Sequence, residues 1–434
     1  MDTNNLPKSF CVLPWMHTAI EPNGRIRPCC ISDYNFTMGN LNKTPLLKDI
    51  FNNDTYKDFR QRLLTSDTLP PECNKCAINE AAGLSSYRTR SNEKYKDFVG
   101  TLEPNLSGEA EFKQLYIDYR FSNKCNFKCI TCGPSLSSSH AVEHKKLYKI
   151  DAKYHSDIDL NGPSIIEVNS ENFLEQFKTF SKDVQEIYFA GGEPLINDHH
   201  YDILNLFVES QQPVKIFYNT NFSNLNYQDY NIMDIWSKIN GPIDLFISID
   251  GVDEQGELIR SGIDLEKFAE NVKRLRQAAL PNLSLHFSIT YGLTNYRDIV
   301  KTTRWLDSLV DSDLNITIGY NPIVYRPAFS MLSMTEDQID WALATIKQQF
   351  ADWVAEDPNS KISKSRLAFA RDLLFKFVEG AKASRYENSV AVKDIKGAMG
   401  YMNSLDVLRK TNWKETLSDM YNDWKEILRA NDVK

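Results

Sequence analysis

The residues of this 434-residue chain that are best suited to chemistry are its eight cysteines. They stand at positions Cys11, Cys29, Cys30, Cys73, Cys76, Cys125, Cys129 and Cys132. A disulfide framework is typical of short secreted chains. This chain is long, its first ten residues contain no apolar signal segment, and its cysteines cluster at close spacing. The pattern therefore indicates metal ligation in a reducing compartment, and a cytoplasmic location is expected.

Three of these cysteines share one short segment, Cys125-Asn-Phe-Lys-Cys129-Ile-Thr-Cys132, directly after a predicted strand. Loops at the carboxyl ends of parallel strands are where such folds place their chemistry. Three thiolates on one tight loop suit three irons of a cubane iron–sulfur cluster, which leaves the fourth iron without a protein ligand. An open iron can bind a small chelating molecule. Structural zinc is the alternative, although zinc prefers four ligands and usually joins paired Cys-x2-Cys units.

The elements that must position this loop follow from the hydrophobic pattern between residues 113 and 330. Short apolar runs rich in β-branched and aromatic residues predict six strands, with helical stretches such as His199–Ser210 and Leu265–Ala279 between most of them. The predicted strands are Leu115–Phe121, Glu186–Ala190, Val214–Asn219, Asp244–Ile249, Leu283–Thr290 and Asn315–Tyr320. Buried helix is the alternative for runs this short. The alternation predicts parallel βαβ units and an α/β fold.

The pattern also divides the rest of the chain. Residues 1–84 hold five cysteines and read as a small domain, and the polar residues 85–112 read as a linker. Residues 331–434 read as helical, with a capping box from Thr335 to Gln338. A formal net charge of −8 without a basic run argues against nucleic-acid binding, and no apolar stretch is long enough to span a membrane.

The cysteine segment, followed after the second predicted strand by Gly191-Gly192-Glu193-Pro194, resembles the radical S-adenosylmethionine (SAM) superfamily. The resemblance implies a partial (β/α)6 TIM-like barrel over residues 113–330. It also implies a [4Fe-4S] cluster on the three cysteines, with SAM chelating the open iron and yielding a 5′-deoxyadenosyl radical on reduction. Thr131 departs from the pattern, because relatives often carry an aromatic residue there.

The resemblance assigns the SAM pocket to residues at the ends of the predicted strands. Gly191, Gly192, Glu193 and Pro194 would bind the methionine amine, since glycines allow close backbone approach and a carboxylate accepts from an ammonium group. A strand-ending turn is the alternative. Further candidates are Asn219 (or Asn221), Ser248, Asp250 and Arg260. The alternatives are a strand cap for Asn219 (or Asn221), an Asp-Gly turn for Ser248 and Asp250, and a solvated arginine for Arg260.

A second set of cysteines, Cys11, Cys29, Cys73 and Cys76, resembles the shortened form of the SPASM module that is called twitch. The resemblance implies one auxiliary iron–sulfur cluster, expected to be [4Fe-4S], that transfers electrons. In most relatives this module follows the barrel, whereas here it precedes it. Cys30 could replace Cys29 as the ligand or be a spare thiol. Structural zinc is again the alternative.

Two other features have competing interpretations. His140-Ala-Val-Glu143-His144 matches a zinc-peptidase string, although a polar helix face explains it as well. On the first predicted strand, the alternating residues that could face the barrel interior form two sets, and the pattern does not choose between them. The sets are Tyr116, Asp118 and Arg120, or Leu115, Ile117 and Tyr119.

The expected function is radical hydrogen abstraction from a peptide or small-molecule substrate. The resemblance also implies an electron donor such as flavodoxin or ferredoxin. Two alternatives stay open: a small-molecule dehydrogenase or epimerase that acts on a sugar or an amino-acid derivative, and a non-catalytic metal-binding scaffold. No membrane or nucleic-acid partner is expected.

Overall fold

The computed structural model describes residues 6–431, except 82, 104, 151–161, 169, 311–315, 325 and 359–364. The chain forms two compact units, each made of several segments. Unit 1 comprises residues 1–124, 165–218 and 234–243, and unit 2 comprises residues 125–164, 219–233 and 244–434.

Unit 1 contains a sheet of order β7-β6-β4-β1-β2-β3. Its strands are β1 (His17–Ile20), β2 (Arg25–Arg27), β3 (Gly39–Asn40), β4 (Tyr116–Tyr119), β6 (Glu186–Phe189) and β7 (Lys215–Thr220, whose last two residues belong to unit 2). Its helices are α1 (Leu13–Met16), α2 (Leu47–Phe51), α3 (Asp54–Thr65), α4 (Asn74–Ala81), α5 (Tyr87–Lys94), α6 (Lys96–Thr101), α8 (Ser170–Phe180) and α9 (Asp198–Ser210); α10 (Ile232–Trp236) crosses the unit boundary.

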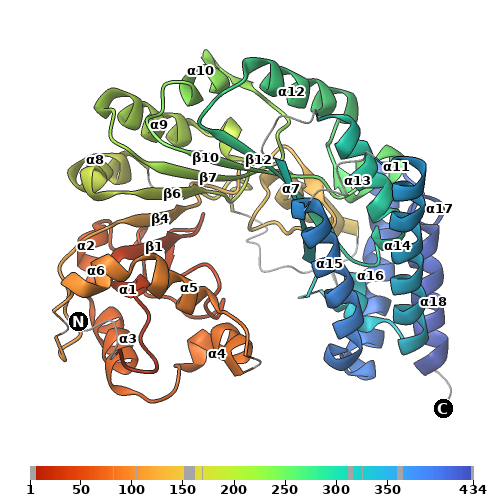
Figure 1. Cartoon of the computed structure of the whole chain (residues 1–434), viewed down its shortest axis with the longest axis horizontal. Helices are drawn as coiled ribbons and strands as arrows, with labels where there is room; N and C mark the ends of the chain where they lie inside the picture. Colours follow the sequence, from red (N-terminus) through yellow and green to blue (C-terminus); the bar gives the residue numbers. More distant parts are fainter. Residues whose placement is uncertain are drawn as a thin grey trace. The chain divides into compact units, whose positions relative to one another are not determined.

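The N-terminal segment is built into this sheet rather than folded apart from it. Strand β1 pairs in parallel with β4, with His17 opposite Tyr116 and Ala19 opposite Asp118, so the two strands lie side by side (Figure 1). Arg60 on α3 links the N-terminal segment to the stretch before β4, because its buried guanidinium donates to Pro14 O at 2.9 Å and to Gly108 O at 3.1 Å. The stretch 85–112, predicted as a linker, contains helices α5 and α6.

The two faces of β4 carry different residues, which decides the choice that the sequence left open. Tyr119 packs on Phe173 of α8 with ring centroids 4.4 Å apart, and Ile117 is fully buried. Because side chains alternate along a strand, Tyr116, Asp118 and Arg120 lie on the opposite face. That face is the one turned away from α8.

Unit 2 contains strands in the order β13-β12-β10 and a helical C-terminal region. Its strands are β5 (Lys128–Cys129), β8 (Asn226–Tyr227), β9 (Tyr230–Asn231), β10 (Ile243–Ser248), β11 (Arg260–Ser261), β12 (Leu283–Tyr291) and β13 (Ile316–Pro322). Its helices are α7 (Ser138–Ile150), α11 (Asp253–Ile259), α12 (Leu265–Ala278), α13 (Ile299–Ser308), α14 (Glu336–Glu356), α15 (Ser365–Gly380), α16 (Asn388–Arg409), α17 (Trp413–Thr416) and α18 (Ser418–Asn431).

The C-terminal helices pack on one another and on the strand ends of unit 2. Helices α14 and α15 lie side by side, as do α16 and α18 (Figure 1). Trp424 is fully buried and its Nε1 donates to Ala328 O at 2.6 Å, while Asp423 accepts from Tyr296 Oη at 2.9 Å. The predicted capping box at the start of α14 is confirmed.

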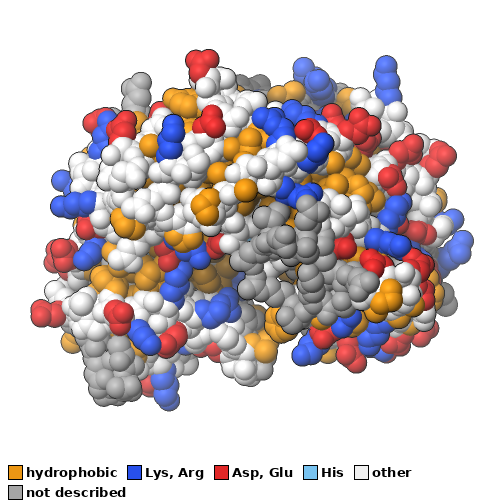
Figure 2. Space-filling model, turned by 45° about the horizontal axis from the view of Figure 1, so that its top comes forward, with side chains coloured by type: hydrophobic (Ala, Val, Ile, Leu, Met, Phe, Trp, Pro, Cys, Tyr) orange, Lys and Arg blue, Asp and Glu red, His pale blue; other side chains and the backbone are white. Residues whose placement is uncertain are grey.

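All six predicted strands are present, as β4, β6, β7, β10, β12 and β13. Residue 315, the first of the last predicted strand, lies outside the described residues. The predicted fold class is confirmed: the protein is α/β, with a partial (β/α)6 barrel, a small N-terminal module and a helical C-terminal region. In the described part of the chain, no helix is both long and apolar enough to cross a bilayer. On the face shown in Figure 2, acidic and basic side chains are interspersed.

Candidate functional site

The three cysteines Cys125, Cys129 and Cys132 lie on one loop of unit 2 that begins where β4 has ended. All three are half-buried and none forms a disulfide. The loop is anchored to the start of α7, where Ser139 Oγ donates to Cys125 O at 2.7 Å. It is also anchored through β5, in which Cys129 lies opposite Arg260 of β11. These contacts hold the two ends of the Cys125–Cys129 segment in place.

The thiols of this loop act on one another electrostatically. Burial raises the pKa of Cys129 to about 11, the Arg260 guanidinium opposes the rise, and the charge of Cys132 adds to it. Burial also raises the pKa of Cys132, against a hydrogen bond from Gly133 and the charges of Arg260 and Arg326. Coordination to iron would remove these protons, as it does for any ligating thiol. Cys129 and Cys132 act on each other, and the Arg260 charge acts on both Cys129 and Cys125, so the loop offers three thiols with a cation beside them as donors for an iron–sulfur cluster with one open iron.

Asp250 and Arg260 form a buried pair next to this loop. Arg260 Nη1 donates to Asp250 Oδ2 at 2.9 Å, and the other carboxylate oxygen accepts from the Thr290 amide at 2.8 Å. Arg260 Nε is buried and has no hydrogen-bond partner among the described residues. The solvated arginine that served as the alternative interpretation is therefore wrong. Asp250 orients Arg260, whose charge acts on Cys129 and Cys125.

The remaining residues of unit 2 that were predicted to line the SAM pocket differ in burial and in their contacts with the cysteine loop. Asn221 is buried, and its Nδ2 donates to Asn126 Oδ1 at 3.0 Å and approaches Cys125 Sγ at 3.9 Å. Asn219 is exposed. Ser248 is half-buried at the end of β10. Of the two asparagines that the sequence offered, the structure therefore brings Asn221 to the cysteine loop.

Gly191 and Gly192 lie in unit 1 at the end of β6, and both have positive φ, +73° and +36°. A Cβ atom at Gly192 would lie 2.3 Å from Lys124 O, so only glycine fits there. Glu193 is buried; its amide donates to Lys124 O at 2.8 Å and its Oε1 accepts from the Leu195 amide at 3.0 Å. The Gly-Gly-Glu-Pro segment is thus fitted against residues 122–124, which lead directly into Cys125.

Unit 1 gathers four of the five N-terminal cysteines. The charges of Cys29 and Cys73 raise the pKa of Cys11 further, after the larger effect of burial. Burial raises the pKa of Cys29 to about 12, and Cys73 and Cys76 both add to the rise. Cys11, Cys29, Cys73 and Cys76 therefore lie within electrostatic reach of one another. Four thiols from three chain segments fit a fully ligated iron–sulfur cluster.

Cys30 faces different neighbours. Burial raises its pKa to about 12, followed by the charge of Asp118, while Arg120 and Arg27 oppose the rise. Asp118 is fully buried and accepts from Arg120 through both oxygens, at 3.1 and 3.0 Å. Register places Asp118 directly between Ala19 of β1 and Tyr188 of β6. Cys30 thus lies by the polar face of β4, outside the four-cysteine group.

The His140, Glu143 and His144 string lies on α7, but its environment is not that of a peptidase or of a solvated face. Glu143 is buried and pairs with Arg409 of α16 at 2.6 Å. The two histidine Nε2 atoms lie 3.5 and 3.4 Å from Tyr401 Oη. Among the described residues, no three His, Cys, Asp or Glu side chains converge so as to hold a single metal ion. The string is a contact surface for α16.

Sequence reasoning missed two arginines that contact the cysteine loop, Arg326 and Arg409. Arg326 Nη1 donates to Ile130 O at 2.7 Å, and Arg409 Nη2 donates to Lys128 O at 2.9 Å. They lie almost two hundred or more positions after the loop in the sequence. No local pattern marks them, because the contact is made only when the C-terminal helices pack.

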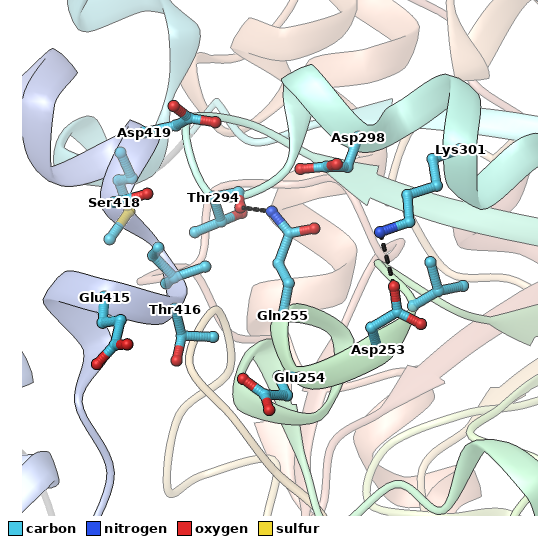
Figure 3. Close-up of a pocket in the computed structure, with 13 residues that line it drawn as sticks. Asp253, Glu254, Gln255, Thr294, Asp298, Lys301, Glu415, Thr416, Ser418 and Asp419 are labelled. Atoms are coloured by element: carbon cyan, nitrogen blue, oxygen red, sulfur yellow. Dashed lines mark hydrogen bonds and ion pairs between the residues drawn. The ribbon is translucent and has the colours of Figure 1, made fainter.

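Unit 2 also has a separate pocket of about 450 Å³ between α11, α13 and the start of α18 (Figure 3). Its lining is mostly polar, with five acidic residues and one lysine. Within it Lys301 pairs with Asp253 at 2.6 Å and Gln255 donates to Thr294 O at 2.9 Å. None of the predicted SAM-pocket residues lines it.

Two family models match the chain. Residues 119–306 match the radical SAM superfamily, and residues 11–77 match the SPASM iron-sulfur cluster-binding domain. None of the curated proteins compared with the chain matches it.

Among the solved structures that match the chain are two of SuiB and one of spore photoproduct lyase. SuiB of Streptococcus suis bound to the precursor peptide SuiA is 11% identical over 63% of this chain and 61% of its own, with a TM-score of 0.31. SuiB bound to S-adenosylmethionine is 13% identical over 62% of this chain and 60% of its own, with a TM-score of 0.32. Spore photoproduct lyase complexed with dinucleoside spore photoproduct is 11% identical over 63% of this chain and 81% of its own, with a TM-score of 0.31. The chain thus spans less than two thirds of the length of these SuiB chains.

Proposed function

We propose that this chain, a radical SAM superfamily enzyme with a SPASM domain ahead of its radical SAM domain, abstracts a hydrogen atom from a peptide substrate. The observation that carries the proposal is the loop with Cys125, Cys129 and Cys132, which form no disulfide and of which Cys125 and Cys129 lie near Arg260, within the segment that matches the family.

The three loop cysteines would hold a [4Fe-4S] cluster with one iron open for SAM. When bound, the reduced cluster and SAM supply a 5′-deoxyadenosyl radical that removes a hydrogen atom from carbon. The methionine end of SAM would bind along the segment Gly191, Gly192, Glu193 and Pro194. The two glycines allow the backbone to approach the ligand closely without a steric clash. Arg260, held by Asp250, would face the SAM carboxylate, with Asn221 (or Asn219) and Ser248 as further lining.

Cys11, Cys29, Cys73 and Cys76 would hold the auxiliary cluster. Complete ligation by four thiolates leaves no iron for substrate, so we assign this cluster to electron transfer. A small acidic carrier such as flavodoxin or ferredoxin would supply electrons. The proposed domain limits are 1–84 for the auxiliary module, 85–112 for the connection, 113–330 for the barrel and 331–434 for the helical region.

We place the substrate on the polar face of β4. Arg120 is half-buried, and its Nη1 makes no hydrogen bond among the described residues, while Asp118 holds the rest of the guanidinium. A guanidinium with a free N–H can bind a peptide carbonyl or carboxylate. The same face reaches from Cys30 beside the auxiliary cysteines to Gly191, whose Cβ position is 2.6 Å from Arg120 Cβ.

The test is anaerobic reduction of the reconstituted protein with SAM, followed by measurement of 5′-deoxyadenosine. Formation of 5′-deoxyadenosine by the parent, and its loss in the Cys125→Ala, Cys129→Ala, Cys132→Ala variant together with the iron of one cluster, supports the proposal. No 5′-deoxyadenosine from fully loaded protein would favour a non-catalytic scaffold instead. Products from a peptide library, against products from sugars or amino-acid derivatives, then decide the substrate class.

A further inference from the structure

Two arginines from the C-terminal part of unit 2 hold the backbone of the cysteine loop. Arg326 Nη1 donates to Ile130 O at 2.7 Å and to Cys132 O at 3.3 Å. Arg409 Nη2 donates to Lys128 O at 2.9 Å. Three carbonyl groups within the five residues 128–132 are therefore held by cations from outside the loop. Such outer contacts orient the ligands of a metal site and tune the metal.

The two arginines differ in net charge at the loop. Arg409 is paired, because Glu143 accepts from its Nε at 2.8 Å and from its Nη2 at 2.6 Å, and both side chains are buried. Glu143 also pairs with Lys128 at 3.3 Å. Arg326 has no ion pair among the described residues. Its guanidinium is half-buried and lies 4.9 Å from the centre of the Phe329 ring. Arg326 is thus a positive charge that acts on Cys132 and that, in the part of the chain that the structure describes, has no carboxylate within ion-pair distance.

We propose that Arg326 is a positioning residue that fixes the Ile130–Cys132 half of the loop and raises the reduction potential of the cluster bound there. The inference rests on the proposed function. Reduction adds one negative charge to the cluster, and a nearby uncompensated cation stabilises the reduced state more than the oxidised state. Partial burial keeps solvent from screening this interaction fully. Arg409 holds the other half of the loop and, being paired, has little effect on the potential.

The experiment is an anaerobic redox titration followed by electron paramagnetic resonance. The signal of the loop cluster is the part that is missing from the Cys125→Ala, Cys129→Ala, Cys132→Ala variant. Arg326→Gln removes the charge, Arg326→Lys keeps it, and Arg304→Gln is the matched control, since Arg304 is an exposed cation of the same unit that pairs with Glu356. Iron per chain is measured for every variant.

We expect Arg326→Gln to shift the midpoint potential of the loop cluster to a more negative value at unchanged iron content. Arg326→Lys should stay near the parent value, and Arg304→Gln should not differ from it. An unshifted potential in fully loaded Arg326→Gln, or an equal shift in Arg304→Gln, would overturn the proposal. If Arg326→Gln does not retain iron, Arg326→Lys decides: a parent-like potential supports the role of charge, and a clear negative shift contradicts it.

Failure of the proposed function is distinguishable from failure of this inference. If the parent and the triple cysteine variant contain equal iron, no cluster is bound at the loop and the proposed function itself is wrong. If the parent contains the extra cluster but its potential does not respond to Arg326, only the inference about Arg326 is wrong.

Discussion

Arg260 lies directly opposite Cys129 in the pairing of β11 with β5, and its guanidinium is bound to Asp250 at 2.9 Å. The pairing ties the middle of the cysteine loop to the residues that follow β10. It also brings the Arg260 charge beside Cys129. Among the described residues, the buried Nε atom of Arg260 has no hydrogen-bond partner, and the proposed function gives it the SAM carboxylate as acceptor.

Asp250→Asn should weaken both the fold and SAM binding. The substitution keeps the shape but leaves Arg260 as a buried charge without its partner, which costs about 3–5 kcal/mol for a broken buried pair. We expect a lower unfolding temperature and roughly tenfold weaker SAM binding, as for a lost charged hydrogen bond. Calorimetry and equilibrium dialysis check these effects. Asp253→Asn, at the exposed pair with Lys301, is the control and should change neither.

Alanine variants of the two adjacent cysteines, Cys29 and Cys30, should differ in their iron content. Cys29→Ala removes a member of the four-thiol group, so we expect this variant to lose the auxiliary cluster. Cys30→Ala leaves that group intact, because the charges around Cys30 are mainly those of Asp118 and Arg120. Iron and acid-labile sulfide per chain provide the measurement. A loss of iron in Cys30→Ala equal to that in Cys29→Ala would contradict the assignment.

Gly192→Ala should abolish SAM binding and destabilise unit 1. The new Cβ would lie 2.3 Å from Lys124 O at a backbone φ of +36°, so the backbone must move. We expect a cost of at least about 1 kcal/mol in the free energy of unfolding. Gly133→Ala is a suitable comparison, since its added Cβ would meet nothing within 4 Å. Similar behaviour of the two variants would refute the steric argument.

Arg409 and Glu143 should show strong coupling. Each single change, Arg409→Gln or Glu143→Gln, breaks a pair that is about 5% exposed on either side, and should cost about 3–5 kcal/mol. The double variant should lose less than the sum of the single losses, because neither charge then remains buried alone. Thermal unfolding of the three variants measures the coupling. Additive losses would show that the pair does not act as a unit.

Acidification should destabilise the protein through its buried neutral histidines. Burial lowers the pKa of His17 to about 4 and that of His200 to about 3, below the ordinary 6.5. Between pH 6.5 and these values the unfolded chain binds more protons than the folded one, so the free energy of unfolding falls as the pH falls through this window. Each histidine contributes up to about 1.4 kcal/mol per pH unit. His200→Gln should show a shallower loss between pH 7 and pH 5 in denaturant titrations; an unchanged slope would exclude His200 as a source.

The sequence by itself determined the features that depend on local spacing. Three thiols within eight positions must lie close along the chain, and short apolar runs rich in β-branched and aromatic residues favour strands, so the shared cysteine loop and all six barrel strands could be predicted. The Thr335 capping box was predictable for the same reason, since its hydrogen bonds join residues only three positions apart. The glycines at 191 and 192 were also identifiable, because close backbone approach favours glycine.

Only the tertiary structure decided what depends on distant segments. The spacing of Cys29 and Cys30 could not separate them, because the choice depends on which neighbour faces Cys73 and which faces Asp118. The alternation of residues along β4 could not show which side of the strand faces the barrel interior. The packing of α8 against Tyr119 decides this, and it leaves Tyr116, Asp118 and Arg120 on the opposite side. Arg326 and Arg409 carry no local signal, since they reach the cysteine loop only through packing between elements that chain connectivity leaves far apart.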